Sequence, residues 1–190
     1  MPRPESPQSQ RLLAAAVDVA LDRGLSGLSL SALARAIGSN NRMLLYYFGS
    51  KDELYTEVTL AAYDRFPELA GLIPSLQADA PLPALLAAGW RRLRAAENLP
   101  YLRLFFEVVA DAVRDPAHNR AQLSVLASHW PEGVRAAFVA HGWPAASAGV
   151  ATTQLLALWR GLQIDLLTGA DVERLDAVHD AAIAALFSDR

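Results

Sequence analysis

The sequence of 190 residues predicts an all-α protein, and its apolar composition is the first reason. It contains 36 Ala and 31 Leu, which favour helices, against 12 Val and 4 Ile, which favour strands. The second reason is periodicity, because apolar residues recur at spacings of three and four along most of the chain. With 53% hydrophobic residues the chain can bury a large core, and the lack of Cys excludes disulfides and thiolate metal sites.

About nine helices are expected, at approximately residues 10–23, 30–37, 41–48, 51–66, 82–96, 101–114, 117–141, 145–168 and 171–187. Residues 1–10 contain three Pro and no apolar run, so we expect a flexible arm and no signal peptide. Four Pro between residues 67 and 83 predict a broken region, and Pro131 is expected to kink or split its helix.

Start and stop signals define the first four helices. The first ends at Arg23-Gly24, a basic last turn followed by glycine, and the second ends at Gly38. Candidate N-caps precede the next three helices, and they are Ser29 or Ser31, Asn40, and Ser50. The fourth helix also carries Asp52 and Glu53 in its first turn, where the helix dipole favours negative charge.

The second and third helices, joined by a tight turn at Gly38-Ser39, form a helix-turn-helix candidate. Their facing apolar residues are Leu30, Leu33, Ala34 and Ile37 on one helix and Leu44 and Phe48 on the other. Asn41, Arg42, Leu45 and Tyr46 are then left on the outward face of the third helix. Asn and Arg are the side chains that read adenine and guanine edges in the major groove.

Further positions between Arg11 and about Leu54 extend this pattern. They are Arg11-Leu12-Leu13-Ala14-Ala15-Ala16, Gly24, Ser29, Leu33-Ala34, Gly38 and Tyr47-Phe48-Gly49-Ser50-Lys51-Asp52-Glu53-Leu54. On these residues the chain resembles the tetracycline-repressor (TetR) family of bacterial transcriptional regulators. The resemblance implies a three-helix DNA-binding domain at residues 11–54 and a larger helical effector-binding and dimerisation domain at 55–190. It also implies that the helix at about 51–66 links them.

Three positions depart from the family pattern. Ser39 stands where Val is usual, Arg42 where Gly is common, and Leu45 where a phosphate-contacting Tyr is usual. Tyr46, the next residue, can take over that phosphate contact. These departures keep an alternative open, in which the chain is an all-α small-molecule-binding or adaptor dimer that has lost sequence-specific DNA binding.

The residues expected to contact DNA are Ser29, Ser31, Asn40, Asn41, Arg42, Met43, Tyr46, Tyr47 and Lys51. Lys51 opens a helix, where a cation is electrostatically unfavourable, so a phosphate partner is expected. Phe48 is expected in the core, whereas Tyr47 fits either the core or a phosphate contact.

Aromatic and polar residues inside the later apolar helices predict a pocket for a small-molecule effector of unknown identity. The candidate ligand residues are Trp90, Tyr101, Phe105, Phe106, Trp130, Trp159 and Gln163. An aromatic stripe that is only core is the alternative. Glu107 and Asp111 are expected on a solvated face or paired with Arg103 or Arg114, and Asp176 with His179 is expected to be a surface pair.

No catalytic, metal or cofactor motif occurs, so an enzyme is not expected. The family resemblance implies a ligand-responsive regulator, most readily a repressor released from a near-palindromic double-stranded DNA operator. A homodimer through the helices at 145–168 and 171–187 is expected, with no membrane partner and a cytoplasmic location. The net charge of −3 divides into +2 for residues 1–50 and −5 for residues 51–190, which suits a positive DNA-binding region on an acidic body.

Overall fold

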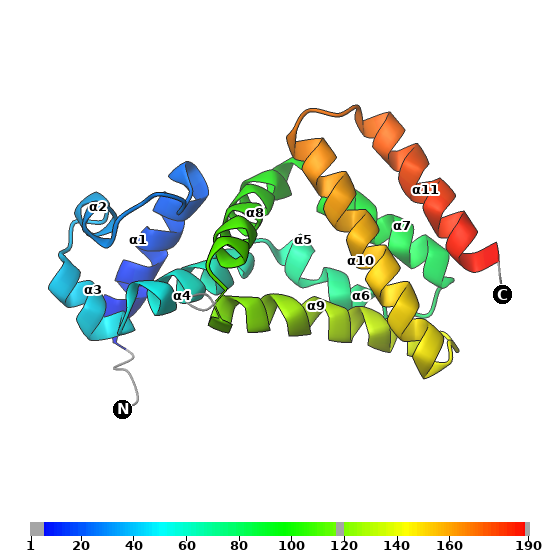
Figure 1. The fold of residues 1–190 in the computed structure, drawn as a ribbon, viewed down its shortest axis with the longest axis horizontal. Helices are drawn as coiled ribbons and strands as arrows, with labels where there is room; N and C mark the ends of the chain where they lie inside the picture. The colour runs from blue at the N-terminus through cyan, green and yellow to red at the C-terminus, as the bar shows by residue number, and fades with distance from the viewer. Residues whose placement is uncertain (1–5, 117–119, 189–190) are drawn as a thin grey trace. The chain divides into compact units, whose positions relative to one another are not determined.

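A computed structural model describes residues 6–116 and 120–188, and only the backbone of residues 120–129. Over these ranges it contains eleven α-helices, one short 3-10 helix and no strand, so the all-α prediction is confirmed (Figure 1). The chain forms two compact units. Unit 1 comprises Met1–Phe66 with Pro100–Val125, and unit 2 comprises Pro67–Leu99 with Leu126–Arg190.

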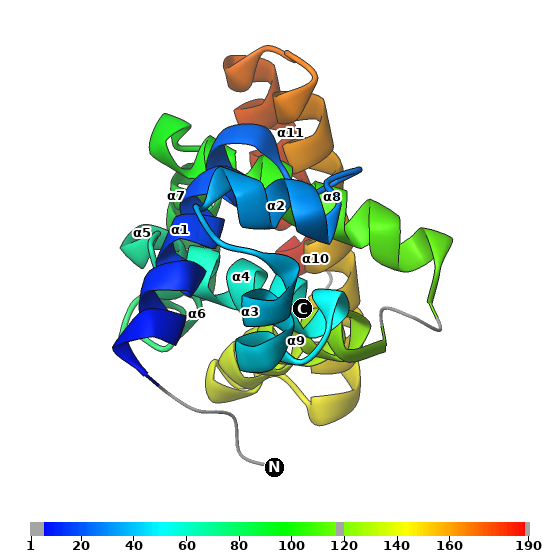
Figure 2. The same cartoon turned by 90° about the vertical axis from the view of Figure 1, so that its left-hand side faces the viewer.

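Unit 1 holds four helices from the start of the chain and nearly all of a later one. They are α1 (Pro7–Arg23), α2 (Leu30–Ala36), α3 (Asn41–Phe48), α4 (Lys51–Tyr63) and α8 (Leu99–Arg114). Figure 2 turns α2 and α3 towards the viewer, with α1 and α4 behind them. Arg65, two residues after the end of α4, forms an ion pair with Asp18 and donates to the carbonyl of Ala14 at 3.0 Å, which helps to hold α4 against α1.

The first helix begins earlier than expected. Ser6 caps α1, and its side chain and that of Ser9 reciprocally bind each other's backbone N–H groups at 3.1 and 3.0 Å. Pro7 fits the first helical position because the N–H group that it lacks has no partner there. The flexible-arm prediction is therefore wrong for residues 7–10, and residues 1–5 lie outside the described part.

The predicted N-caps of α2, α3 and α4 are confirmed. The side chains of Ser29, Asn40 and Ser50 accept from the third backbone N–H of their helices at 3.1, 3.0 and 3.1 Å. Gly38 turns the chain between α2 and α3 with φ of +66°, a conformation that favours glycine. The end of α4 at Tyr63 falls three residues before the expected Phe66.

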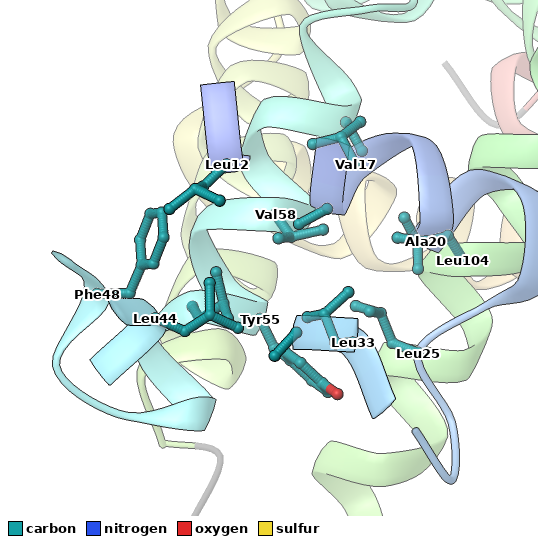
Figure 3. Packing of buried hydrophobic residues seen from close by; sticks show 14 of the residues in the cluster. Leu12, Val17, Ala20, Leu25, Leu33, Leu44, Phe48, Tyr55, Val58 and Leu104 are labelled. Atoms are coloured by element: carbon teal, nitrogen blue, oxygen red, sulfur yellow. The ribbon is translucent and has the colours of Figure 1, made fainter. Parts of the chain in front are cut away.

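The core of unit 1 draws on all five helices (Figure 3). Leu12 and Val17 of α1, Leu33 of α2, Leu44 and Phe48 of α3, Val58 of α4 and Leu104 of α8 are among its buried residues. Leu33, Leu44 and Val58 are completely buried. The apolar faces predicted for the helix-turn-helix are thus confirmed. They pack into one core with residues of α1, α4 and α8.

Unit 2 holds α5 (Pro67–Ala70), α6 (Leu72–Ser75), α7 (Leu82–Leu93), the 3-10 helix η1 (Ala96–Asn98), the later part of α9 (Arg120–Ala140), α10 (Ala145–Leu167) and α11 (Val172–Ser188). The short α5 and α6 lie where only a broken region was expected. Pro67 opens α5, a position that proline tolerates. Pro131 does not split α9, which runs through it, and the expected helical residues 117–119 lie outside the described part.

Helix α11 lies beside both α7 and α10 within unit 2 (Figure 1). The largest fully buried side chains of unit 2 are Trp90 of α7 and Trp159 of α10. Gly89 permits this packing, because a Cβ at that position would lie 3.3 Å from the Trp159 ring. Nowhere in the described residues does a helix combine the length and apolar character needed to cross a lipid bilayer.

Candidate nucleic-acid interface

One face of α3 is buried and the other is exposed to solvent. Leu44 and Phe48 are 0% and 2% exposed, so the predicted core position of Phe48 is confirmed. Asn41, Arg42, Leu45 and Tyr46 are all exposed, as the sequence predicted. Leu45 and Tyr46 keep 43% and 65% of their surface exposed.

The two asparagines at the start of α3 have different hydrogen bonds. The Oδ1 atom of Asn40 accepts from the backbone N–H of Met43 at 3.0 Å, which satisfies the helix end. The Nδ2 atom of Asn41 donates to Oγ of Ser31 on α2 at 2.7 Å. Asn40 is therefore occupied by capping, whereas the amide of Asn41 keeps groups available on the exposed face.

A tyrosine that the sequence reasoning missed lies between two predicted phosphate contacts. The hydroxyl of Tyr55 donates to the carbonyl of Leu28 at 2.8 Å, directly before Ser29. The ammonium of Lys51 lies 4.9 Å from the centre of the Tyr55 ring. Burial, followed by the charge of Asp111, raises the pKa of Tyr55 to about 12, so its hydroxyl keeps its proton at neutral pH.

Tyr55 thus connects the start of α4 with the start of α2. Its position four residues after Lys51 puts both on one face of α4, and this was the available sequence signal. Of the remaining predicted contacts, Met43 is half-buried. Tyr47 is also half-buried and packs against the core of unit 1, with its ring 5.0 Å from that of Tyr46.

Glu107 of α8 holds the loop between α1 and α2. Its Oε2 atom accepts from the backbone N–H groups of Leu25 and Ser26 at 2.8 and 3.2 Å. Gly24, with φ of +77°, lies so close that a Cβ would collide with the carboxylate. The expectation of a solvated or arginine-paired Glu107 is therefore wrong, because its partners are backbone groups more than 80 residues earlier. The expected pair of Asp111 with Arg114 is present at 3.2 Å.

In unit 2 the predicted surface pair of Asp176 with His179 is wrong. His179 is completely buried, and its ring stacks on Trp90 with centroids 5.7 Å apart. Asp176 instead accepts from Nε1 of Trp90 at 2.8 Å and pairs with Arg94 at 2.8 Å. Burial is the largest cause of a lowered pKa of His179, which outweighs the opposing effect of Asp180.

Three predicted ligand residues of unit 2 are Trp130, Trp159 and Gln163. The rings of Trp130 and Trp159 meet edge to face at 6.4 Å. Trp159 and Gln163 are 1% and 5% exposed, one turn apart on α10. The Nε1 atom of Trp159 and the Nε2 atom of His179 are buried without a hydrogen-bond partner among the described residues.

Trp90 is the fourth predicted ligand residue of unit 2, and the remaining three, Tyr101, Phe105 and Phe106, belong to unit 1. The ring centroid of Tyr101 lies 5.5 Å from that of Tyr63 and 5.6 Å from that of Phe66. The ring centroids of Phe105 and Phe106 are 5.2 Å apart. Burial raises the pKa of Tyr101. The seven candidates are thus divided between the two units, with four in unit 2. In the described part of the chain no three metal-binding side chains come together.

Comparison with known protein families gives a match over the region of the helix-turn-helix. A family model described as bacterial regulatory proteins, tetR family, matches residues 12–58, which run from α1 into α4. No curated protein sequence is similar enough to count as a relative.

Solved structures share the fold over nearly the whole chain. A transcriptional regulator from Rhodococcus sp. Rha1 has a TM-score of 0.75 at 21% identity, covering 95% of this chain and 96% of its own. A protein from Mesorhizobium loti described as a TetR-family transcriptional regulator has a TM-score of 0.66 at 18% identity, with 96% of each chain covered. The multidrug binding protein EbrR, complexed with imidazole, has a TM-score of 0.72 at 22% identity, again with 96% of each covered. Residues 12–58 of this chain are thus a TetR-family domain, and the chain as a whole has the fold of such regulators.

Proposed function

We propose that this protein is a DNA-binding transcriptional regulator that reads its operator with α3. The observation that carries the proposal is the solvent-exposed face of α3, with Asn41 and Arg42 at the helix start, inside a TetR-family domain. The first residues of a recognition helix are those that reach base edges in the major groove. Arg42 is assigned to a guanine, whose O6 and N7 accept from a guanidinium.

Phosphate contacts are assigned to the residues that flank this face. Ser29 and Lys51 lie on either side of Tyr55, which ties the start of α4 to the residue before α2. A phosphate compensates the unfavourable position of Lys51 at a helix start. Tyr46, with its large exposed surface, takes the phosphate contact that Leu45 cannot make.

We further propose a homodimer through α10 and α11. Both helices expose aliphatic side chains, and Val150 and Ile164 of α10 keep 61% and 48% of their surface, while Val178 of α11 keeps 44%. Two such helices from each of two chains make a four-helix bundle. A two-fold dimer suits a near-palindromic operator with half-sites about 34–36 Å apart.

Unit 2 is proposed to bind a small-molecule effector that releases the repressor from DNA. Two buried polar atoms support this, Nε1 of Trp159 and Nε2 of His179, because neither has a hydrogen-bond partner among the residues that the structure describes. The buried amide of Gln163 lies one helical turn after Trp159. EbrR, which shares the fold, has been crystallised with imidazole, proflavin and ethidium.

Release requires that effector and DNA each weaken the binding of the other by the same factor. In this proposal the effector displaces α4, which changes the separation of the two α3 helices in the dimer. The protein acts by binding alone, without catalysis, cofactor or metal.

The experiment is fluorescence anisotropy with labelled duplexes from the DNA upstream of the gene and its neighbours. We expect a specific complex that weakens steeply as salt rises, because phosphate contacts release counterions. A folded dimer that binds small molecules but no DNA specifically would support the alternative, a binding or adaptor protein.

A further inference from the structure

We propose that Ser31 is a positioning residue for base recognition, which orients the amide of Asn41 to read an adenine. This inference rests on the proposed function, since it specifies how α3 reads its operator. It gives Ser31 a different task from the phosphate contact expected for a serine beside DNA.

The geometry that carries the inference is the hydrogen bond between the first turns of α2 and α3. Nδ2 of Asn41 donates to Oγ of Ser31 at 2.7 Å, and both side chains are exposed. Asn41 is the first residue of α3, where a recognition helix comes closest to the bases. The bond restrains the amide on the face that is proposed to meet DNA.

The remaining groups of the amide match one base. A primary amide has two N–H donors and an acceptor oxygen, and one donor is used by Ser31. One N–H and the Oδ1 atom remain, and within the described residues neither has a further partner. Adenine presents the complementary pair in the major groove, an acceptor at N7 and a donor at N6.

The neighbouring side chains differ in this respect. The Oδ1 atom of Asn40 accepts from the N–H of Met43, which ties its amide to the start of its own helix, whereas the amide of Asn41 is oriented by a side chain of α2. The hydroxyl of Ser29 accepts from the N–H of Ala32 and caps α2. Ser29 is therefore a matched control, an exposed serine two residues away whose hydroxyl has a backbone partner.

The test begins with selection of binding sites from a random-sequence duplex library by the full-length protein. Selection with N41A identifies the base pair whose preference depends on Asn41. Affinities are then measured for the selected site and for the same site with that adenine replaced. We expect the wild-type protein to favour adenine by about 5- to 150-fold and N41A to lose this ratio.

The variants of Ser31 separate positioning from phosphate binding. S31A is expected to lower the adenine ratio at the same base pair by about 2- to 12-fold, the range for one neutral hydrogen bond. S31T keeps the hydroxyl and is expected to keep the ratio. S29A is expected to weaken binding to both duplexes equally and leave the ratio unchanged. Thermal unfolding verifies that each variant is folded.

An S31A protein that keeps the wild-type adenine ratio would overturn the inference, whether its affinity is unchanged or equally reduced for both duplexes. An equal reduction would instead assign Ser31 to a phosphate. A wild-type protein that enriches no sequence contradicts the proposed function itself, and the inference with it.

Discussion

The two units use polar side chains in opposite ways. In the helix-turn-helix of unit 1, polar residues lie at the surface, and the caps of α2, α3 and α4 bind backbone groups three residues away. In unit 2, polar groups are buried among aromatic rings, and the partner of Trp90 lies 86 residues along the chain. The difference suggests that unit 1 presents its chemistry outward to a large partner, whereas unit 2 keeps its chemistry inside.

Removing the buried ring of Trp159 should have the largest effect. W159A is expected to lower the free energy of unfolding by about 3–5 kcal/mol, because the ring is almost fully buried against Gly89 and Trp130. Urea denaturation followed by circular dichroism measures the loss.

W159F is the matched control. It removes the indole N–H but keeps an aromatic ring, and that N–H has no partner among the described residues. The loss should therefore be clearly smaller than for W159A. Equal losses would show that the indole N–H of Trp159 has a stabilising partner. The buried polar groups of unit 2 would then not be unsatisfied.

Glu107 tests whether the helix-turn-helix depends on distant residues as well as local ones. E107A leaves the N–H groups of Leu25 and Ser26 without their carboxylate, so we expect a loss of about 1–3 kcal/mol in the free energy of unfolding. E107Q keeps an acceptor oxygen and should lose less.

Hydrogen exchange of the Leu25 and Ser26 amides gives a local readout of the same change. Faster exchange at these two amides, with the interior of α1 unaffected, is the expected pattern. Unchanged exchange in E107A would contradict the assigned role of Glu107.

The smallest expected effect is a pH dependence from His179. Burial lowers its pKa from the ordinary 6.5, so the folded state favours the neutral ring over the protonated one. The unfolded chain then binds the proton more readily, and stability should fall as the pH drops below about 6.5. At higher pH both states are neutral and the effect disappears.

Melting temperatures between pH 5 and 8 (a range around the ordinary His value) test this for the wild-type protein and H179Q. The variant should lose part of the acid sensitivity. Parallel profiles would show that His179 does not contribute to the pH dependence of stability.

These differences between the units also explain what the sequence could predict. Caps such as Ser29, Asn40 and Ser50 act over three residues, and the apolar faces of α2 and α3 follow the helical period, so both were readable. The exposed face of α3 followed directly from the buried one. The DNA-contacting and ligand-binding roles of individual residues remain predictions.

The features that escaped prediction depend on contacts distant in sequence. Glu107 binds backbone groups of a loop that has no signal for a carboxylate, and His179 looks like a surface residue until α7 brings Trp90 against it. Tyr55 was overlooked because its role depends on where the α1–α2 loop passes. The short α5 and α6 were hidden by the prolines around them.

The central claim is that the exposed face of α3 reads DNA, and paired titrations of R42A and K51A test it most directly. Anisotropy is measured on the selected site and on a scrambled duplex over a series of salt concentrations. R42A is expected to lose about 1–3 kcal/mol on the selected site and little on the scrambled one. K51A should weaken binding to both and reduce the salt slope by about 1. Folded variants that bind both duplexes as the wild-type protein does would contradict the claim.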